Sequence, residues 1–95
     1  MKLNDFYGDV VTLVTLQGDI VGRVQKSDDT TVTLKNPRLF IQSKEGAGFV
    51  PGVSVTCQQN IEEATFNFSS ILTVVQPVDE IVKSWQQMTS GIILR

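Results

Sequence analysis

Residues 10–35 constrain the fold more than any other stretch, because they read as three antiparallel strands joined by two short turns. In the third of these segments, Val32 and Leu34 alternate with polar residues, which is the period-two pattern of a half-buried strand. Gly18 suits the positive φ of a tight hairpin turn, and Gly22 sits mid-strand, where glycine permits a sharp bend. The pattern predicts a small, bent antiparallel meander.

Further strands are predicted after this meander. Asn36-Pro37 is expected to interrupt the third strand, because proline lacks the N–H that a ladder requires. Short apolar or alternating runs then predict an extended hairpin formed by residues 39–41 and 53–58 around the loop 43–48, followed by strands at 64–68 and 71–75 with a Ser69-Ser70 turn between them.

The hydrophobic period changes after Pro77. Apolar residues recur at intervals of three and four from Val78 to Met88, which predicts an amphipathic C-terminal α-helix over about residues 77–90. Pro77 suits the first turn and Gly91 suits the C-terminal cap. The segment Ile92 to Arg95 is apolar enough to dock on another surface, such as that of a neighbouring subunit.

Length and composition limit what the chain can do. Its 95 residues predict one domain over 1–95 with a thin core, so homo-oligomerisation is expected to help bury apolar surface. A net charge of −2 argues against broad non-specific binding to phosphate backbones. The single cysteine, Cys57, excludes an internal disulfide and favours a cytoplasmic location, and no apolar run is long enough for a membrane span.

The chain contains no histidine, and this absence argues against an enzyme. Serine and cysteine triads lose their usual base, and transition-metal sites lose their commonest ligand. Gly46-Ala47-Gly48 is not followed by the lysine of a phosphate-binding loop. We therefore expect no catalytic residue, no metal and no cofactor, with Cys57 as a small buried hydrophobe.

The order of residue types from Leu16 to Leu34 resembles the first motif of the Sm-like (LSm) family. The resemblance rests on Leu16-Gln17-Gly18, Gly22-Arg23-Val24, Asp28-Asp29 and Val32-Thr33-Leu34. It implies a small, strongly bent antiparallel β-barrel of five strands, whose outer strands pair between subunits into a closed ring and whose inner turns bind RNA. The family's second motif would fall on residues 66–71, where Asn67 and Phe68 replace a basic residue and a glycine.

Two functions follow from these observations and both stay open. The first is a non-enzymatic ring subunit that binds RNA or single-stranded nucleic acid. The second is an oligomeric assembly or adaptor module that binds protein partners through the C-terminal helix and has no RNA role. The candidate nucleic-acid contacts are Lys26, Lys35, Arg38, Phe68, Ser69 and Ser70. Gly18, Gly22, Asp28 and Asp29 are assigned structural roles in turns, with metal binding as the alternative for the two aspartates.

Overall fold

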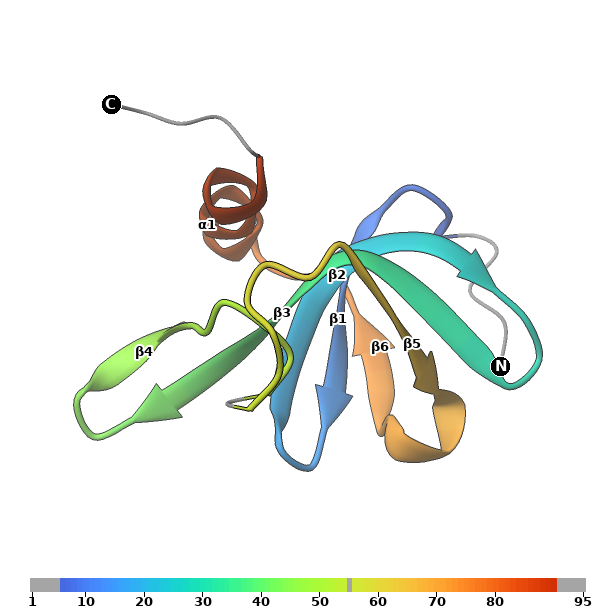
Figure 1. The fold of residues 1–95 in the computed structure, drawn as a ribbon, viewed down its shortest axis with the longest axis horizontal. Helices are drawn as coiled ribbons and strands as arrows, with labels where there is room; N and C mark the ends of the chain where they lie inside the picture. The colour runs from blue at the N-terminus through green and yellow to red at the C-terminus, as the bar shows by residue number, and fades with distance from the viewer. Residues whose placement is uncertain (1–5, 55, 91–95) are drawn as a thin grey trace.

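The computed structural model describes residues 6–54 and 56–90, which form one antiparallel sheet of six strands and a C-terminal helix (Figure 1). The described elements, in chain order, are β1 (Val10–Thr15), β2 (Gly18–Ser27), β3 (Thr31–Ser43), β4 (Gly46–Phe49), β5 (Glu63–Asn67), the 3-10 helix η2 (Phe68–Ser70), β6 (Thr73–Val75) and α1 (Asp79–Thr89). The mainly-β class, the three-strand meander and the C-terminal helix are therefore confirmed.

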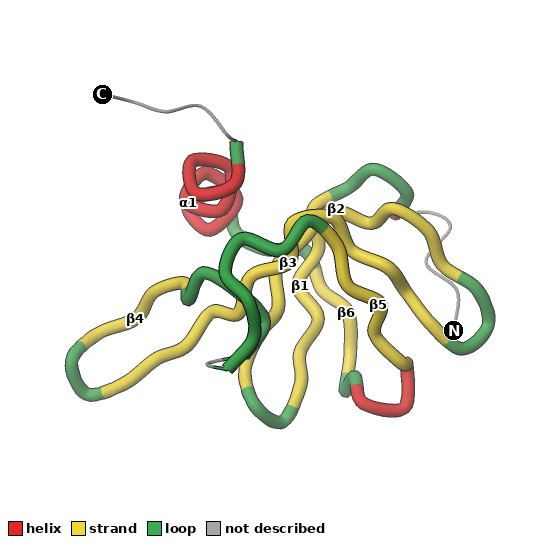
Figure 2. Tube along the Cα trace, in the orientation of Figure 1, coloured by secondary structure: helices red, strands yellow, loops and turns green. Residues whose placement is uncertain are grey.

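The strands follow the order β4-β3-β2-β1-β6, and β5 also pairs with β3. The long strand β3 has two partners, because its first half pairs with β5 and its last four residues pair with β4. The sheet curves strongly and α1 lies on one side of it (Figures 1 and 2). In the described chain β5 and β6 do not pair with each other, so the sheet is not closed.

The bend in the sheet lies at Gly22. A Cβ at this position would lie 3.0 Å from both Cβ and Cδ1 of Leu34, so only glycine fits without displacing a core side chain. Register shifts opposite Gly22, where Val21 pairs with Arg38 but Arg23 pairs with Lys35. The sequence-based role of Gly22 as a bend is thus supported by its close contact with β3.

The prediction that Asn36-Pro37 interrupts the third strand is wrong. β3 continues from Thr31 to Ser43, and these two residues form a bulge opposite Gly22. A bulge leaves a residue outside the ladder, so the missing N–H of Pro37 costs no interstrand hydrogen bond. Asn36 adopts a φ of 52°, which asparagine tolerates better than most residues.

The extended hairpin is present, but the predicted position of its second strand is wrong. β4 at residues 46–49 pairs with the end of β3, and the rings of Phe40 and Phe49 meet edge to face with centroids 5.0 Å apart. The expected strand at 53–58 is a loop in its described residues, and residue 55 lies outside them. Backbone bonds hold the connection from β4 to β5 against β3, from Val50 N to Leu39 O, from Leu39 N to Gly52 O and from Asn36 N to Glu62 O.

The two faces of the sheet bury different side chains. The main core lies on the concave face and contains Val11, Leu13, Ile20, Val24, Val32, Leu34, Leu39 and Ile71. On the opposite face, Thr12 pairs with Val21 and both are buried beside α1. The helix therefore covers part of the face that the main core leaves exposed.

Trp85 attaches α1 to the sheet. This side chain is 3% exposed, and its indole Nε1–H donates to the Asn36 carbonyl over 2.9 Å. The Arg23 guanidinium carbon lies 5.5 Å from the centroid of the Trp85 ring, within cation–π range. We call Gly22, Arg23, Asn36 and Trp85 the helix junction. Gly91, which was expected to cap α1, and the segment 92–95 lie outside the described residues.

Candidate functional site

Two turns far apart in the sequence meet at one end of the sheet. Thr31 pairs with Asn67 across β3 and β5, and Phe68 N donates to Thr30 O over 2.9 Å. Antiparallel pairing of β3 with β5 brings these segments together, because β3 begins where β5 ends. We call residues 28–30 and 68–70 the paired turns, and they are where the Sm-like resemblance places RNA contacts.

Asp28 organises the first of the paired turns. Its Oδ1 accepts the backbone N–H groups of Thr30 and Thr31 over 2.8 and 2.7 Å, and the two threonine hydroxyls lie at 3.3 and 3.1 Å. These bonds, above all the one from Thr30 N–H, hold the pKa of Asp28 below its ordinary value. The predicted role of Asp28 as a turn former agrees with this geometry, and Asp29 beside it is exposed.

Asn67 organises the second turn in a similar way. Its Oδ1 accepts from the backbone N–H and the hydroxyl of Ser69, over 3.1 and 3.0 Å, and Ser70 Oγ donates to the Asn67 carbonyl over 2.7 Å. Both serines are exposed. Phe68 is half-buried and packs against the core cluster, so it does not present an open ring for a base to stack on.

The two predicted lysine contacts lie apart. Lys26 is exposed at the end of β2, where it borders a hollow of about 190 Å³ together with Asp28 and Thr31. Lys35 is exposed on β3 beside the helix junction, in a hollow that includes Arg23 and Trp85. The structure therefore places Lys26, Ser69 and Ser70 at or beside the paired turns, and Lys35 away from them.

Arg38 is inside the protein, with 3% of its surface exposed. Its NH1 group donates to the carbonyls of Pro37 and Ile61 over 2.8 and 2.9 Å, and its Nε has no hydrogen-bond partner among the described residues. Burial lowers the pKa of this guanidinium. Arg38 thus secures the connection between β4 and β5 against β3, and it is not available at the surface to a nucleic acid.

No group of three or more potential metal ligands occurs in the described residues. Cys57 is half-buried, and its Sγ accepts the Val53 N–H over 3.3 Å. Hydrogen bonding, with the Ser54 backbone first, lowers the pKa of the thiol, and a Cβ at Gly52 would collide with the sulfur. None of the helices in residues 6–54 and 56–90 has the length and apolar character needed to cross a bilayer.

Comparisons with known proteins leave the chain unassigned. No protein-family model matches it, and a search of curated proteins finds no match. The Sm-like resemblance therefore rests on the first-motif residues alone.

The helix junction is a cluster of interacting residues that the sequence did not predict. Its members come from β2, β3 and α1, and the bond between Trp85 and Asn36 joins residues 49 positions apart. Two of its members stood out individually in the sequence, because one is a tryptophan on the apolar face of a helix and the other is a glycine within a strand. Nothing local to either residue indicated that they belong to one cluster.

Proposed function

We propose that the chain is a non-enzymatic subunit of an Sm-like ring, in which β5 of one copy pairs with β6 of the next and the bent sheet forms a small barrel. The observation that carries this proposal is the strand order. If the β4 hairpin is set aside, the remaining five strands follow the order β5-β3-β2-β1-β6, with β5 and β6 at the two ends. This is the arrangement that the family resemblance implies, with two outer strands left for neighbouring subunits.

Backbone geometry supports pairing at both end strands, which we call the open edges. Val24 N donates to Asp9 O, so alternate residues of β1 bond β2 and leave Thr12 and Val14 to bond β6. Thr12 and Val14 pair with Val75 and Thr73, so the backbone groups of Val74 between them point away from β1. On β5, Phe68 N donates to Thr30 O, so the backbone groups of Thr65 and Asn67 point away from β3.

Such edges invite pairing with another chain. A row of outward N–H and C=O groups is a template for a further strand, and proteins usually cover or pair it. Because the two edges are different surfaces of one chain, their pairing is head to tail, and a head-to-tail contact closes into a ring when its rotation permits. In every copy, the outward backbone groups of both edges would then be hydrogen-bonded.

The first test removes one donor from an open edge. Thr65→Pro deletes an outward N–H of β5 while keeping the β5 to β3 backbone hydrogen bonds. Thr65→Val retains the donor and is a matched control, because both variants lose the hydroxyl contact with Thr33. Native mass spectrometry is expected to show an assembled wild type and Thr65→Val, and a monomeric Thr65→Pro whose circular dichroism is unchanged. Equal oligomers for all three chains would contradict pairing through β5.

A nucleic-acid role rests on Lys26, Ser69 and Ser70, which a ring would repeat around its axis. Fluorescence anisotropy at low salt, where phosphate binding is strongest, should detect oligo(U), oligo(A) or a structured RNA. Lys26→Ala should weaken that binding, whereas Lys35→Ala, which lies away from the paired turns, should have less effect. Absence of binding to all three RNAs would overturn the RNA role.

An assembly module that binds protein partners is the second candidate. Two carboxylates, Asp28 and Asp29, stand beside Lys26 at the paired turns, and they oppose the approach of phosphate. Apolar surface near α1 favours a protein contact, since Val78 is 66% exposed. Nuclease treatment separates the two candidates, because recovery of a specific partner that survives it supports the assembly module and loss of that recovery supports RNA.

A further inference from the structure

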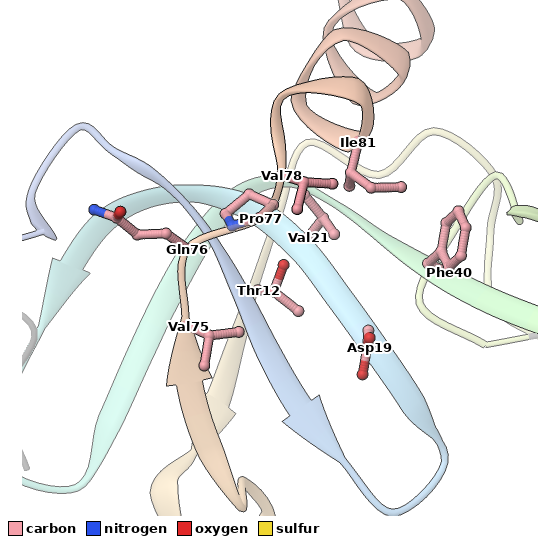
Figure 3. Close-up of a pocket in the computed structure, with 9 residues that line it drawn as sticks. All are labelled: Thr12, Asp19, Val21, Phe40, Val75, Gln76, Pro77, Val78 and Ile81. Carbon is pink, nitrogen blue, oxygen red and sulfur yellow. The ribbon is translucent and has the colours of Figure 1, made fainter.

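An apolar hollow of about 200 Å³ lies where the start of α1 approaches the outer face of the sheet. Figure 3 shows its lining side chains, which come from β1, β2, β3, β6, the linker 76–78 and the first turn of α1. We call this hollow the α1–β6 groove. Its lining residues are Thr12, Asp19, Val21, Phe40, Val75, Gln76, Pro77, Val78 and Ile81.

The groove combines exposed apolar surface with one negative charge. Val78 and Val75 are 66% and 44% exposed, although both line a concave surface. Asp19 is the charged residue of the lining. Among the described residues, no hydrogen bond or ion pair to its carboxylate is found. An apolar segment that carries a basic residue would match both features.

We propose that the α1–β6 groove binds the segment Ile92-Ile93-Leu94-Arg95 of a second copy of this chain. The three apolar side chains would cover Val75, Val78 and the residues around them, and burial of such side chains is the main source of binding energy at an interface. Arg95 would pair with Asp19, where a partly desolvated carboxylate gains from a guanidinium partner.

The segment after Ser90 is too short to fill the groove of its own chain, which argues that a second copy supplies it. An extended segment advances about 3.5 Å per residue, so Leu94 lies at most about 14 Å from Ser90. Along the helix axis, Val78 lies about 18 Å from Ser90, at 1.5 Å per residue. A segment that folded back along its own helix would bring Leu94 no further than about the level of Ile81, with Ile92 and Ile93 short of the groove.

The position of the groove also suits a contact between copies. Val75 contributes its side chain to the groove, and the backbone groups of its neighbour Val74 face the open edge of β6. A copy that pairs with β6 would therefore lie beside the groove. The inference requires a second copy, and in this respect it rests on the assembly proposed above.

Disulfide trapping tests the inference directly. In a Cys57→Ser background, chains carrying Val78→Cys are mixed with chains carrying Leu94→Cys and oxidised mildly. We expect a disulfide-linked heterodimer of the two chains. Ser84→Cys, on an exposed part of α1 that does not line the groove, is the matched control and should give at least several-fold less heterodimer. Equal trapping at Ser84→Cys would overturn the proposal, and so would an intramolecular disulfide in the Val78→Cys, Leu94→Cys double variant.

A charge exchange tests the Asp19 contact. Asp19→Lys and Arg95→Glu should each lower the trapped heterodimer about two- to fivefold, the range for a partly exposed ion pair, and the combined exchange should restore it. No restoration would overturn the ion pair.

Light scattering of the wild type separates the two proposals. An assembled wild type without specific trapping would overturn the docking of this segment alone, whereas a monomeric wild type would overturn the ring.

Discussion

The helix junction and the open edges are parts of the same bent sheet. They differ in how many of their polar groups are hydrogen-bonded within one chain. At the helix junction, the bulge created by the bend exposes the Asn36 carbonyl, and Trp85 from α1 binds it. At the open edges, alternate backbone groups of β5 and β6 have no strand beside them in the described chain. At the helix junction the hydrogen-bond partner comes from the same chain. At the open edges a partner strand has to come from another chain.

This difference separates stability from assembly. Substitutions at the helix junction should change the free energy of unfolding of each chain, because its contacts are intramolecular. Substitutions at the open edges should change the oligomeric state, because no intramolecular bond depends on the outward groups. Losses of unfolding free energy at the helix junction are the intramolecular counterpart of the assembly effect expected for Thr65→Pro.

Trp85→Ala should give the largest loss in the free energy of unfolding. Removal of a buried tryptophan costs about 3–5 kcal/mol, which is a large share of the stability of a small domain. Urea unfolding followed by circular dichroism would measure it. Trp85→Phe keeps most of the packing and loses the bond to Asn36, so its cost should be about 1 kcal/mol. Equal losses in the two variants would show that packing of the ring contributes nothing at this site.

Gly22→Ala should be the next most harmful change. Its Cβ would lie 3.0 Å from Leu34 Cβ and 3.3 Å from the Lys35 carbonyl, so the strands must separate. Overpacking of this kind costs about 1–3 kcal/mol in thermal or urea unfolding. Gly48→Ala is the control, because nothing lies within 4 Å of its Cβ. If Gly22→Ala were as stable as Gly48→Ala, the close approach of β2 to β3 would not be needed for the bend.

Arg23→Met should have a smaller effect. It loses the 2.6 Å bond from NH1 to the Gly8 carbonyl and the cation–π contact with Trp85. Both contacts are near the surface, so we expect a loss of about 1 kcal/mol in the free energy of unfolding. Lys35 is exposed beside the helix junction, and Lys35→Met should change the free energy of unfolding by less than about 0.5 kcal/mol. If Lys35→Met lost more unfolding free energy than Arg23→Met, the charge that stabilises this region would be that of Lys35 on β3.

Asp28→Asn should give the smallest effect, and one that depends on pH. The pKa of Asp28 is lowered in the folded chain, so its charged form contributes stability at pH values above the unfolded pKa of about 3.9. That contribution is lost as pH falls toward the folded pKa. Melting temperatures from pH 7 to pH 3 should therefore show the wild type ahead of Asp28→Asn at neutral pH and the two converging in acid. A constant difference would mean that the charge is unimportant.

Sequence alone identified the parts of the fold that depend on local patterns. The period-two runs from Val10 to Lys35 and the helical spacing after Pro77 are local signals, and both elements are present. Gly22 was recognisable because glycine within a strand usually marks a bend or a close approach.

Other features depend on contacts that no local pattern reveals. Pro37 reads as the end of a strand, yet the bulge opposite Gly22 accommodates it within β3. Residues 53–58 alternate like a strand, but β4 already occupies the edge of β3 that they would need. Arg38 resembles a surface cation in the sequence, because arginine is rarely buried. In the structure its guanidinium donates to the neighbouring Pro37 carbonyl and to the Ile61 carbonyl 23 positions away, and the second acceptor has no local signal.

The mass of the wild-type protein in solution tests the central claim most directly. A single chain has a mass of 10.5 kDa. Size-exclusion chromatography with light scattering is expected to give one closed species at a whole multiple of this mass, unchanged on dilution through the micromolar range. A species at the mass of one chain throughout that range would contradict the pairing of β5 with β6.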